Sequence, residues 1–145
     1  MAMDVKKIVS DCIASWDSHD ADKIVSFFTE DGDWTRPEGV FKGKEELKRC
    51  FNVTLSNVKN IKLTVSGNGI ITEGNKAYNE LMVSGIYMGK KVEFLEIDAY
   101  ECSDGKIKHV RSVYDRLSVV KQAAKGWLPK MMVNSMVKQT EKGLH

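Results

Sequence analysis

Residues 91–118 read KVEFLEIDAYECSDGKIKHVRSVYDRLS, and this stretch decides the fold. Apolar and polar residues alternate on both sides of the Ser-Asp-Gly turn at 103–105, a pattern typical of two strands joined as a hairpin. Two further alternating stretches cover about 58–72 and 76–88, and the first of them contains a glycine pair that predicts a bulge. Four consecutive strands with hairpin turns predict an antiparallel meander.

Three helices are predicted before these strands. An apolar stripe from Val5 to Trp16 has helical spacing. Asp20 is a suitable N-cap for a second, short helix, and a third helix follows Gly43, while Trp34 falls in a short extended piece. Because a sheet with one apolar face needs a cover, we expect these helices to pack on it. The predicted fold is α+β, with the helices first and the sheet second.

The whole chain has 145 residues, 42% of them hydrophobic, and a formal net charge of +2. This composition predicts a globular protein with one core rather than a disordered chain. No apolar run reaches the ~20 residues of a membrane span, and the first residues lack the apolar core of a signal peptide. Three widely spaced cysteines favour a reducing compartment over a disulfide framework. We therefore expect a cytoplasmic protein.

The charge divides the chain into two predicted parts. Residues 121–145 carry a net charge of +4 and residues 1–120 a net charge of −2. An acidic body with a basic tail does not fit a nucleic-acid-binding protein, which needs a basic face across the domain. The tail has a methionine-rich apolar stripe beside its lysines. It could cover its own domain, pack on a partner subunit, or lie on an anionic membrane, and we rank the membrane last.

The order of motifs resembles the NTF2-like superfamily, in particular its SnoaL-like and ketosteroid-isomerase-like members. The resemblance rests on residues 27–34, 41–47, 94–100 and 104–115, and it extends over about 3–120. It implies a cone, in which a strongly curved sheet wraps around a helix and leaves a hydrophobic pocket open at one end. It also implies a homodimer formed through the outer face of the sheet. Members of this superfamily include enzymes, carriers and protein adaptors, so the fold alone does not decide the function.

The catalytic groups of two related enzyme types are largely missing. In ketosteroid isomerases, a well-known case of pKa tuning, a tyrosine and a protonated aspartic acid form the oxyanion hole. A second aspartate is the base. By resemblance, Asp98 takes the place of the oxyanion-hole aspartic acid, but Cys12 replaces the tyrosine and Arg36 replaces the base. The acidic and basic positions of limonene-epoxide hydrolases fall on Leu81, Val83 and Ser112. Neither mechanism is therefore expected.

Asp98 remains the candidate catalytic residue, by analogy with polyketide cyclases that use a single carboxylate in the pocket. A carboxyl group in an apolar pocket has a raised pKa and can serve as general acid or base. Alternatively, Asp98 only accepts a hydrogen bond from a tyrosine or tryptophan inside the cone. Glu96 lies on the same face of the strand and could share the acid and base roles, although a solvated or salt-bridged position at the rim is the commoner arrangement.

Six residues are predicted to bind a ligand: Trp34, Arg36, Glu96, Tyr100, Ser112 and Tyr114. Arg36 could hold an anion or simply pair with Glu38 or Asp33. His109 has no set of His, Asp or Glu residues at ligand spacing, so we expect neither a metal nor an organic cofactor. The leading hypothesis is a protein that binds a small hydrophobic or aromatic molecule and acts as an isomerase, cyclase or lyase. The alternative is a non-catalytic adaptor that binds a protein partner through its sheet or its C-terminal helix.

Overall fold

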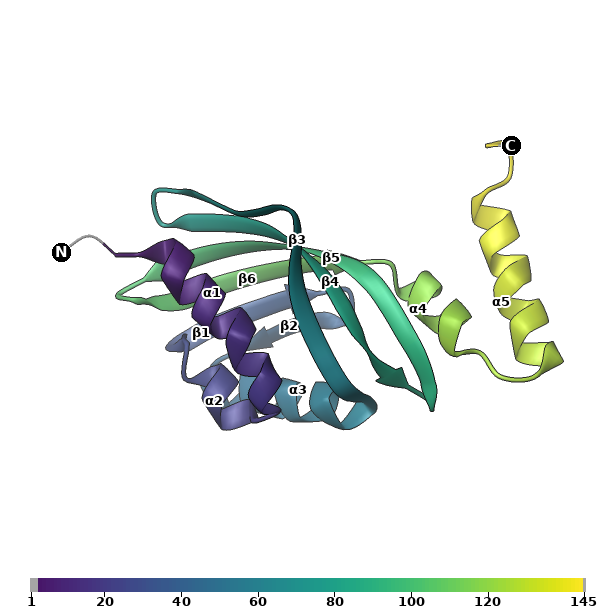
Figure 1. The fold of residues 1–145 in the computed structure, drawn as a ribbon, viewed down its shortest axis with the longest axis horizontal. Helices are drawn as coiled ribbons and strands as arrows, with labels where there is room; N and C mark the ends of the chain where they lie inside the picture. The colour runs from purple at the N-terminus through teal and green to yellow at the C-terminus, as the bar shows by residue number, and fades with distance from the viewer. Residues whose placement is uncertain (1–2, 145) are drawn as a thin grey trace.

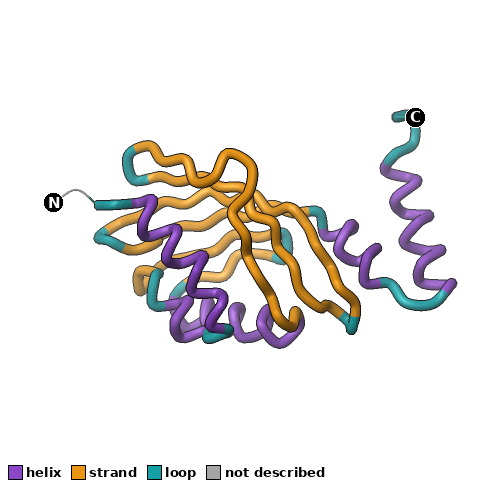
Figure 2. The backbone as a smooth tube through the Cα atoms, in the orientation of Figure 1, coloured by secondary structure: helices purple, strands orange, loops and turns teal. Residues whose placement is uncertain are grey.

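The computed structural model describes residues 3–144, which form five α-helices, one short 3-10 helix and six strands. In chain order the elements are α1 (Val5–Ser15), the 3-10 helix (Trp16–Ser18), α2 (Ala21–Val25), β1 (Phe28–Arg36), β2 (Gly39–Lys42), α3 (Lys44–Asn57), β3 (Val58–Glu73), β4 (Lys76–Tyr87), β5 (Lys90–Ser103), β6 (Lys106–Tyr114), α4 (Arg116–Ala123) and α5 (Trp127–Thr140). The prediction of an α+β fold is confirmed (Figure 2).

The strands form one curved sheet in the order β2-β1-β6-β5-β4-β3. From β3 to β6 each strand pairs antiparallel with the next, as the meander predicted, whereas β1 runs parallel to β6. The register between β3 and β4 shifts between Ser66 and Ile70, where Gly67 and Gly69 have φ angles of +57° and +72°. This irregularity is the predicted bulge, and it lets β3 bend across the sheet.

The N-terminal helices lie on the concave side of the sheet (Figure 1). The buried hydrophobic core comes from these helices and from the sheet. Asp20 accepts hydrogen bonds from the backbone N–H groups of Asp22 and Lys23, so α2 begins at the predicted N-cap. Phe51 of α3 is 1% exposed and meets Trp16 and Trp34 with ring centroids 5.5 Å away in each case. Burial of each large apolar side chain contributes roughly 1.5–3 kcal/mol to stability.

Two details of the sheet differ from the sequence expectation. The polar residues 29–33, whose composition suits a break between elements, belong to β1, which lies between β2 and β6. The Asp33 backbone pairs with Lys42 on one side and His109 on the other, while the Glu30 and Asp31 side chains face solvent. β1 and β2 thus join the sheet before the meander begins. The last strand ends at Tyr114 rather than Ser118, since Asp115 caps α4 by accepting from the Ser118 N–H at 3.1 Å.

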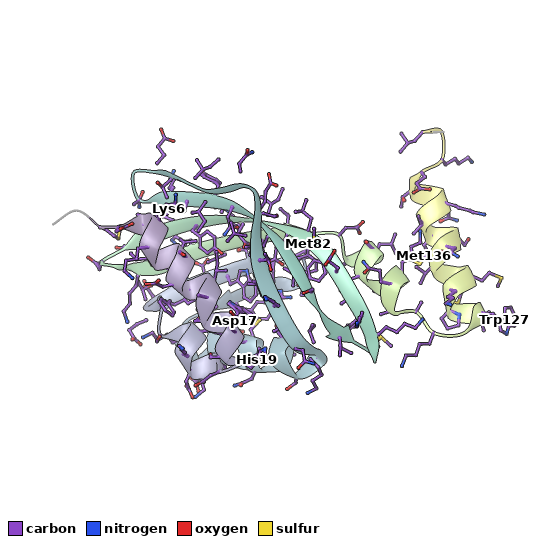
Figure 3. The ribbon with its side chains drawn as sticks, in the orientation of Figure 1. Lys6, Asp17, His19, Met82, Trp127 and Met136 are labelled. Atoms are coloured by element: carbon purple, nitrogen blue, oxygen red, sulfur yellow. The ribbon has the colours of Figure 1, made fainter. Side chains whose placement is uncertain are left out.

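The C-terminal helices behave differently from each other. α4 is tied to β5, because the Gln122 side-chain amide donates to the Glu93 carbonyl and accepts from its N–H, both at 2.9 Å. α5 stands away from the sheet, and Figure 3 shows Trp127 at the far end of the molecule. The predicted division at residue 120 falls inside α4 and stays a prediction. None of the helices within residues 3–144 is long and apolar enough to cross a membrane.

Candidate functional site

The interior of the sheet carries the candidate site residues in cross-strand rows. Asp98 of β5 lies opposite Ser112 of β6, and Glu96 lies opposite Tyr114. Because successive side chains of a strand point to opposite faces, these four residues share the concave face with Tyr100. Burial follows this alternation, since Asp98 is 2% exposed and Ser112 5% exposed, while the residues between them are on the outer face.

Asp98 is the acceptor at the centre of a buried hydrogen-bond network. The Ser112 hydroxyl donates a short hydrogen bond to Asp98 Oδ1, and the Tyr100 hydroxyl donates to Oδ2 at 3.1 Å. The Trp34 indole Nε1–H in turn donates to Ser112 Oγ at 2.7 Å. The Ser112 hydroxyl thus accepts from the Trp34 indole and donates to Asp98, so the direction of the Ser112 hydroxyl proton is fixed.

Glu96 lies beside Asp98, and the two carboxyl groups are buried together. Burial raises the pKa of Glu96 well above its usual value, and the charge of Asp98 and a hydrogen bond with it raise the pKa further. Burial also raises the pKa of Asp98, although the hydrogen bonds from Ser112, Tyr100 and Glu96 oppose that rise. The pair therefore retains a proton that rests mainly on Glu96, because only Asp98 has hydroxyl donors to stabilise its charge.

A second polar cluster surrounds Arg36 at the end of β1. Its Nε donates to Glu38 at 2.6 Å, its Nη1 to Thr54 at 3.1 Å and its Nη2 to the Tyr114 hydroxyl at 2.9 Å. Tyr114 also donates a short hydrogen bond to Glu38. The guanidinium carbon lies 4.4 Å from the centre of the Trp34 ring. Burial disfavours the charge of Arg36, but Tyr114 and Glu38 outweigh it and raise the pKa.

The Arg36 cluster borders a cavity of about 350 Å³, which Trp34 and Glu96 of the inner network also line. Its walls come from α3, the 3-10 helix, every strand of the sheet and α4, and apolar side chains such as Val83 and Phe94 predominate among them. Glu96 lies at its inner end, and exposed residues of α3 and α4 form its mouth. A smaller adjoining cavity of about 30 Å³ reaches Asp98, Tyr100 and Ser112. Glu96 borders both cavities, so it lies between Asp98 and the larger space.

The sequence of residues 9–110 matches the SnoaL-like domain family. The chain belongs to this family. The NTF2-like resemblance and the cone are thereby confirmed, and structures of the same fold support them. No curated protein matches the chain in sequence.

Several solved structures share the SnoaL-like fold at low sequence identity. A protein of ketosteroid isomerase-like fold from Catenulispora acidiphila, in complex with trimethylamine, is 18% identical, with a TM-score of 0.74 over 80% of this chain and 91% of that one. TerC, crystallised with polyporic acid, is 15% identical, with a TM-score of 0.71 over 81% and 95% of the two chains. An NTF2-like protein of unknown function from Burkholderia pseudomallei is 13% identical, with a TM-score of 0.74 over 85% and 100%. At these identities the likeness shows the fold alone.

In this SnoaL-like domain the structure brings the predicted site residues to two places. Asp98, Tyr100 and Ser112 meet at the inner end of the cone, and Trp34 joins them through its indole. Arg36 and Tyr114 meet near the mouth. Glu96 differs from the expected rim residue, since it is 9% exposed and its carboxylate has no salt bridge within residues 3–144.

Three residues of this SnoaL-like site were not singled out from sequence. Arg49 and Arg116 line the mouth, but both come from helix surfaces on which a charged residue is ordinary. Asn79 lies opposite Asp98 on β4 and is buried, and its polar atoms make no hydrogen bond of good geometry to the described residues, although they lie near Tyr100. The alternation of β4 places Asn79 on the concave face, so this residue could have been found.

The described part of the chain contains no cluster of three or more potential metal ligands. His109 lies on the opposite side of the sheet from the cavity, where its Nδ1 is 2.7 Å from a carboxylate oxygen of Asp33. Cys12 is buried and its pKa is raised by burial, which keeps the thiol protonated. Neither residue takes part in the two polar clusters.

Proposed function

We propose that this SnoaL-like protein binds a small, largely apolar molecule in its cavity and acts on it without a cofactor, as an isomerase, cyclase or lyase. The observation that carries this proposal is the Glu96–Asp98 pair, whose Glu96 lines a cavity of about 350 Å³ with Asp98 directly behind it. A cavity of that size with a few converging polar groups is the usual form of a ligand site. The family relationship supports a ligand-binding or cyclase-type role.

The shared proton of the carboxyl pair is what makes acid–base chemistry possible. When the proton rests on Glu96, that group donates a hydrogen bond or a proton to a carbonyl oxygen in the cavity. When the proton rests on Asp98, the Glu96 carboxylate accepts a proton from a carbon next to the carbonyl. In both cases Asp98 acts by exchanging a proton with Glu96, and the Ser112 and Tyr100 hydroxyls stabilise the charge of Asp98.

The walls of the cavity support a flat or aromatic ligand. Trp16, Trp34, Phe94 and Tyr114 all line the cavity, and the Phe94 and Tyr114 rings lie 5.1 Å apart. Such rings bury a large apolar area against a flat molecule. The relative crystallised with polyporic acid is consistent with this class of ligand.

Hydrogen exchange of 2-tetralone in D2O tests the proposal, because this two-ring ketone has acidic hydrogens beside its carbonyl. We expect the protein to accelerate the exchange measured by proton NMR. Glu96→Gln and Asp98→Asn should each reduce the acceleration by about 100-fold, the size of a general acid–base contribution. Glu73→Gln, at the exposed end of β3, is the control and should have no effect.

The outcomes separate catalysis from binding. Exchange that persists in both variants would overturn the assignment of the carboxyl pair. If 2-tetralone binds, as seen by quenching of tryptophan fluorescence, but does not exchange, the protein is a carrier rather than an enzyme. Quenching should be measured with Trp127→Phe, because Trp127 is 76% exposed and responds to surface contacts.

A second candidate function is a protein contact made by the chain itself. The outer face of the sheet exposes Leu95, Ile97 and Val113, and α5 exposes Met131 and Met136, so two apolar surfaces lack a cover within residues 3–144. We propose a homodimer through the sheet face, with α5 as a further contact. Light scattering after size exclusion tests this: Val113→Lys should yield monomers, whereas a monomeric parent protein would contradict it.

We also propose a cytoplasmic location. Cys12, Cys50 and Cys102 are all free thiols and all buried, which suits a reducing compartment. We rank membrane contact by α5 below protein contact. Flotation with anionic liposomes, comparing the full chain with a chain truncated after Lys125, tests this ranking, and binding that depends on residues 126–145 would reverse it.

A further inference from the structure

The mouth of the cavity is rich in arginine. Arg36 ends β1, Arg49 lies on α3 and Arg116 begins α4, and all three line the same cavity. The Arg36 side chain is only 12% exposed, whereas Arg49 and Arg116 are 63% and 60% exposed. One guanidinium is thus held inside the wall, and two stand at the opening.

The carboxylates around the mouth do not balance these charges. Glu38 is the carboxylate that lines the mouth, and it serves two arginines: it pairs with Arg36 at 2.6 Å and lies 3.9 Å from Arg116 Nε. Glu46, which does not line the cavity, lies 3.3 Å from Arg49. Three guanidinium groups therefore face two carboxylates, and the mouth keeps a positive charge.

Arg36 also retains a donor that points to no protein acceptor. A guanidinium has five N–H groups. Glu38 takes the Nε–H, Thr54 and the Cys50 sulfur lie by Nη1, and Tyr114 takes one hydrogen of Nη2. The second Nη2–H has no acceptor within residues 3–144. An anion at the mouth would supply one.

The rings near the mouth argue against a cationic ligand. A cation is usually held over the faces of aromatic rings. Here Arg36 already occupies that position, with its guanidinium carbon 4.4 Å from the Trp34 ring centre and 5.8 Å from that of Tyr114. The relative that binds trimethylamine therefore does not predict the charge of this chain's ligand. A second positive charge would be repelled from rings that a guanidinium already covers.

Resting on the proposed function, we infer that the cavity is specific for carboxylic acids with an apolar, ring-containing body. The carboxylate would lie at the mouth among Arg36, Arg49 and Arg116, and the body would lie against the apolar walls. Carboxylates suit this position because guanidinium groups bind their two oxygens in a matching planar arrangement. The inner end of the same ligand would then approach Glu96. Burial raises the pKa of Glu96 well above its usual value, which weakens its repulsion of an anion.

Calorimetric titration with 2-naphthoate and 2-naphthamide tests the inference, since the two molecules have the same ring body and differ in charge. At pH 7.5 we expect naphthoate to bind the full-length protein at least tenfold more tightly than the amide. The double variant Arg49→Gln/Arg116→Gln should weaken naphthoate binding about tenfold, the size expected for two ion pairs made by largely exposed side chains, and leave the amide unchanged. Arg111→Gln, which removes one positive charge on the exposed outer face of β6, is the control and should change neither constant.

Each outcome bears on a different claim. If the amide binds as tightly as naphthoate, or if the double variant binds naphthoate unchanged, the preference for a carboxylate is overturned while the ligand-binding cavity stands. If neither compound binds, both this inference and the proposed function fail. Thermal unfolding of each variant should match the parent protein, because both substituted side chains are largely exposed.

Discussion

The two ends of the cavity hold their charged side chains in opposite ways. At the inner end, Glu96 and Asp98 have no salt bridge within the described residues, and their pKa values are raised chiefly by burial. At the mouth, partial burial disfavours the charge of Glu38, but the hydrogen bond from Tyr114 and the charge of Arg36 outweigh it and lower the pKa. The inner end therefore retains a proton, while the mouth retains a charge.

This difference in protonation between the two ends arises over only two residues along β6. Tyr114 at the mouth and Ser112 at the inner end are alternate residues of β6, opposite Glu96 and Asp98. The charge of Arg36 lowers the pKa of both inner carboxyls, but burial raises each of them more strongly. Burial in the cone thus decides the protonation state of a carboxyl group. A carboxyl group buried away from water tends to keep its proton, whereas one that water can reach is ionised and pairs with a cation.

The largest expected effect is at the inner end. Asp98→Ala removes the acceptor of the Ser112 and Tyr100 hydroxyls and leaves two buried donors unpaired. We expect the free energy of unfolding in urea to fall by about 3–4 kcal/mol, the range for a broken buried network. Asp98→Asn keeps one acceptor oxygen and should cost about half as much. Equal stability of Asp98→Ala and the parent protein would mean that water replaces the carboxylate at this depth.

A comparable change at the mouth should cost less. Arg36→Met keeps much of the apolar stem but removes the guanidinium between Glu38, Thr54 and Tyr114. Because the Glu38 side chain is 34% exposed, solvent can take over part of the lost interaction. We expect a loss of about 2 kcal/mol in the same urea experiment. A loss larger than that of Asp98→Ala would reverse the comparison between the two ends.

The inner end was easier to predict from sequence than the mouth. The alternation of residues 94–100 is enough to place Asp98 and Tyr100 on one face of β5, because strand parity is a local property. The pairing of Asp98 with Ser112 also requires the register shift between Glu101 and Cys102, since the turn alone would place Asp98 opposite Arg111. The position of Arg36 depends instead on the parallel pairing of β1 with β6, which joins residues far apart in the chain. Local patterns do not specify such a pairing.

The burial of Glu96 could not be predicted from the sequence either. Strand parity places Glu96 on the same face as Asp98. Whether water reaches that face depends on the curvature of the sheet and on the packing of α3 and α4 over it. The sequence does not distinguish α4 from a longer last strand, since Leu117 continues past Tyr114 the apolar alternation to which Val113 belongs. Asp115 ends the strand by capping the helix, and a single capping residue is a weak signal among alternating residues.

The pH dependence of stability tests whether the inner pair keeps a proton. The folded-state pKa of Glu96 lies above its unfolded value, so the folded protein binds more protons, and its stability must fall as the pH rises. This stability is fully present below about pH 4.5, the ordinary glutamate pKa, and is lost as the pH rises through the raised pKa of the pair. A tenfold tighter hold on the proton in the folded state corresponds to about 1.4 kcal/mol of stability.

Glu96→Gln separates this effect from the other titrating groups. The amide still donates to Asp98, so the variant should keep the fold and lose most of the decline in stability above pH 5, as measured by urea unfolding across pH 4.5–8. Arg36, Glu38, Cys12 and Tyr100 also act on the pair or its neighbours, and they remain unchanged in the variant. An identical decline in the variant and the parent protein would show that the pair does not hold a proton.

The smallest effect expected comes from one substitution made at both ends. Tyr100→Phe and Tyr114→Phe each remove one hydroxyl that donates to a carboxylate, Asp98 in the first case and Glu38 in the second. Tyr100 is 8% exposed, so the loss leaves Asp98 short of a donor that water does not replace, and we expect about 1.5 kcal/mol. At the mouth, Arg36 and water remain near Glu38, and we expect about 0.5 kcal/mol. Burial and the hydrogen bond to Glu38 raise the pKa of Tyr114 to about 12, so neither tyrosine ionises between pH 6 and 8 and the difference should not vary there. Equal losses in the free energy of unfolding at the two ends would mean that water is excluded from the mouth as strongly as from the interior. The protonated inner end and the charged mouth would then differ only because Arg36 is present at the mouth.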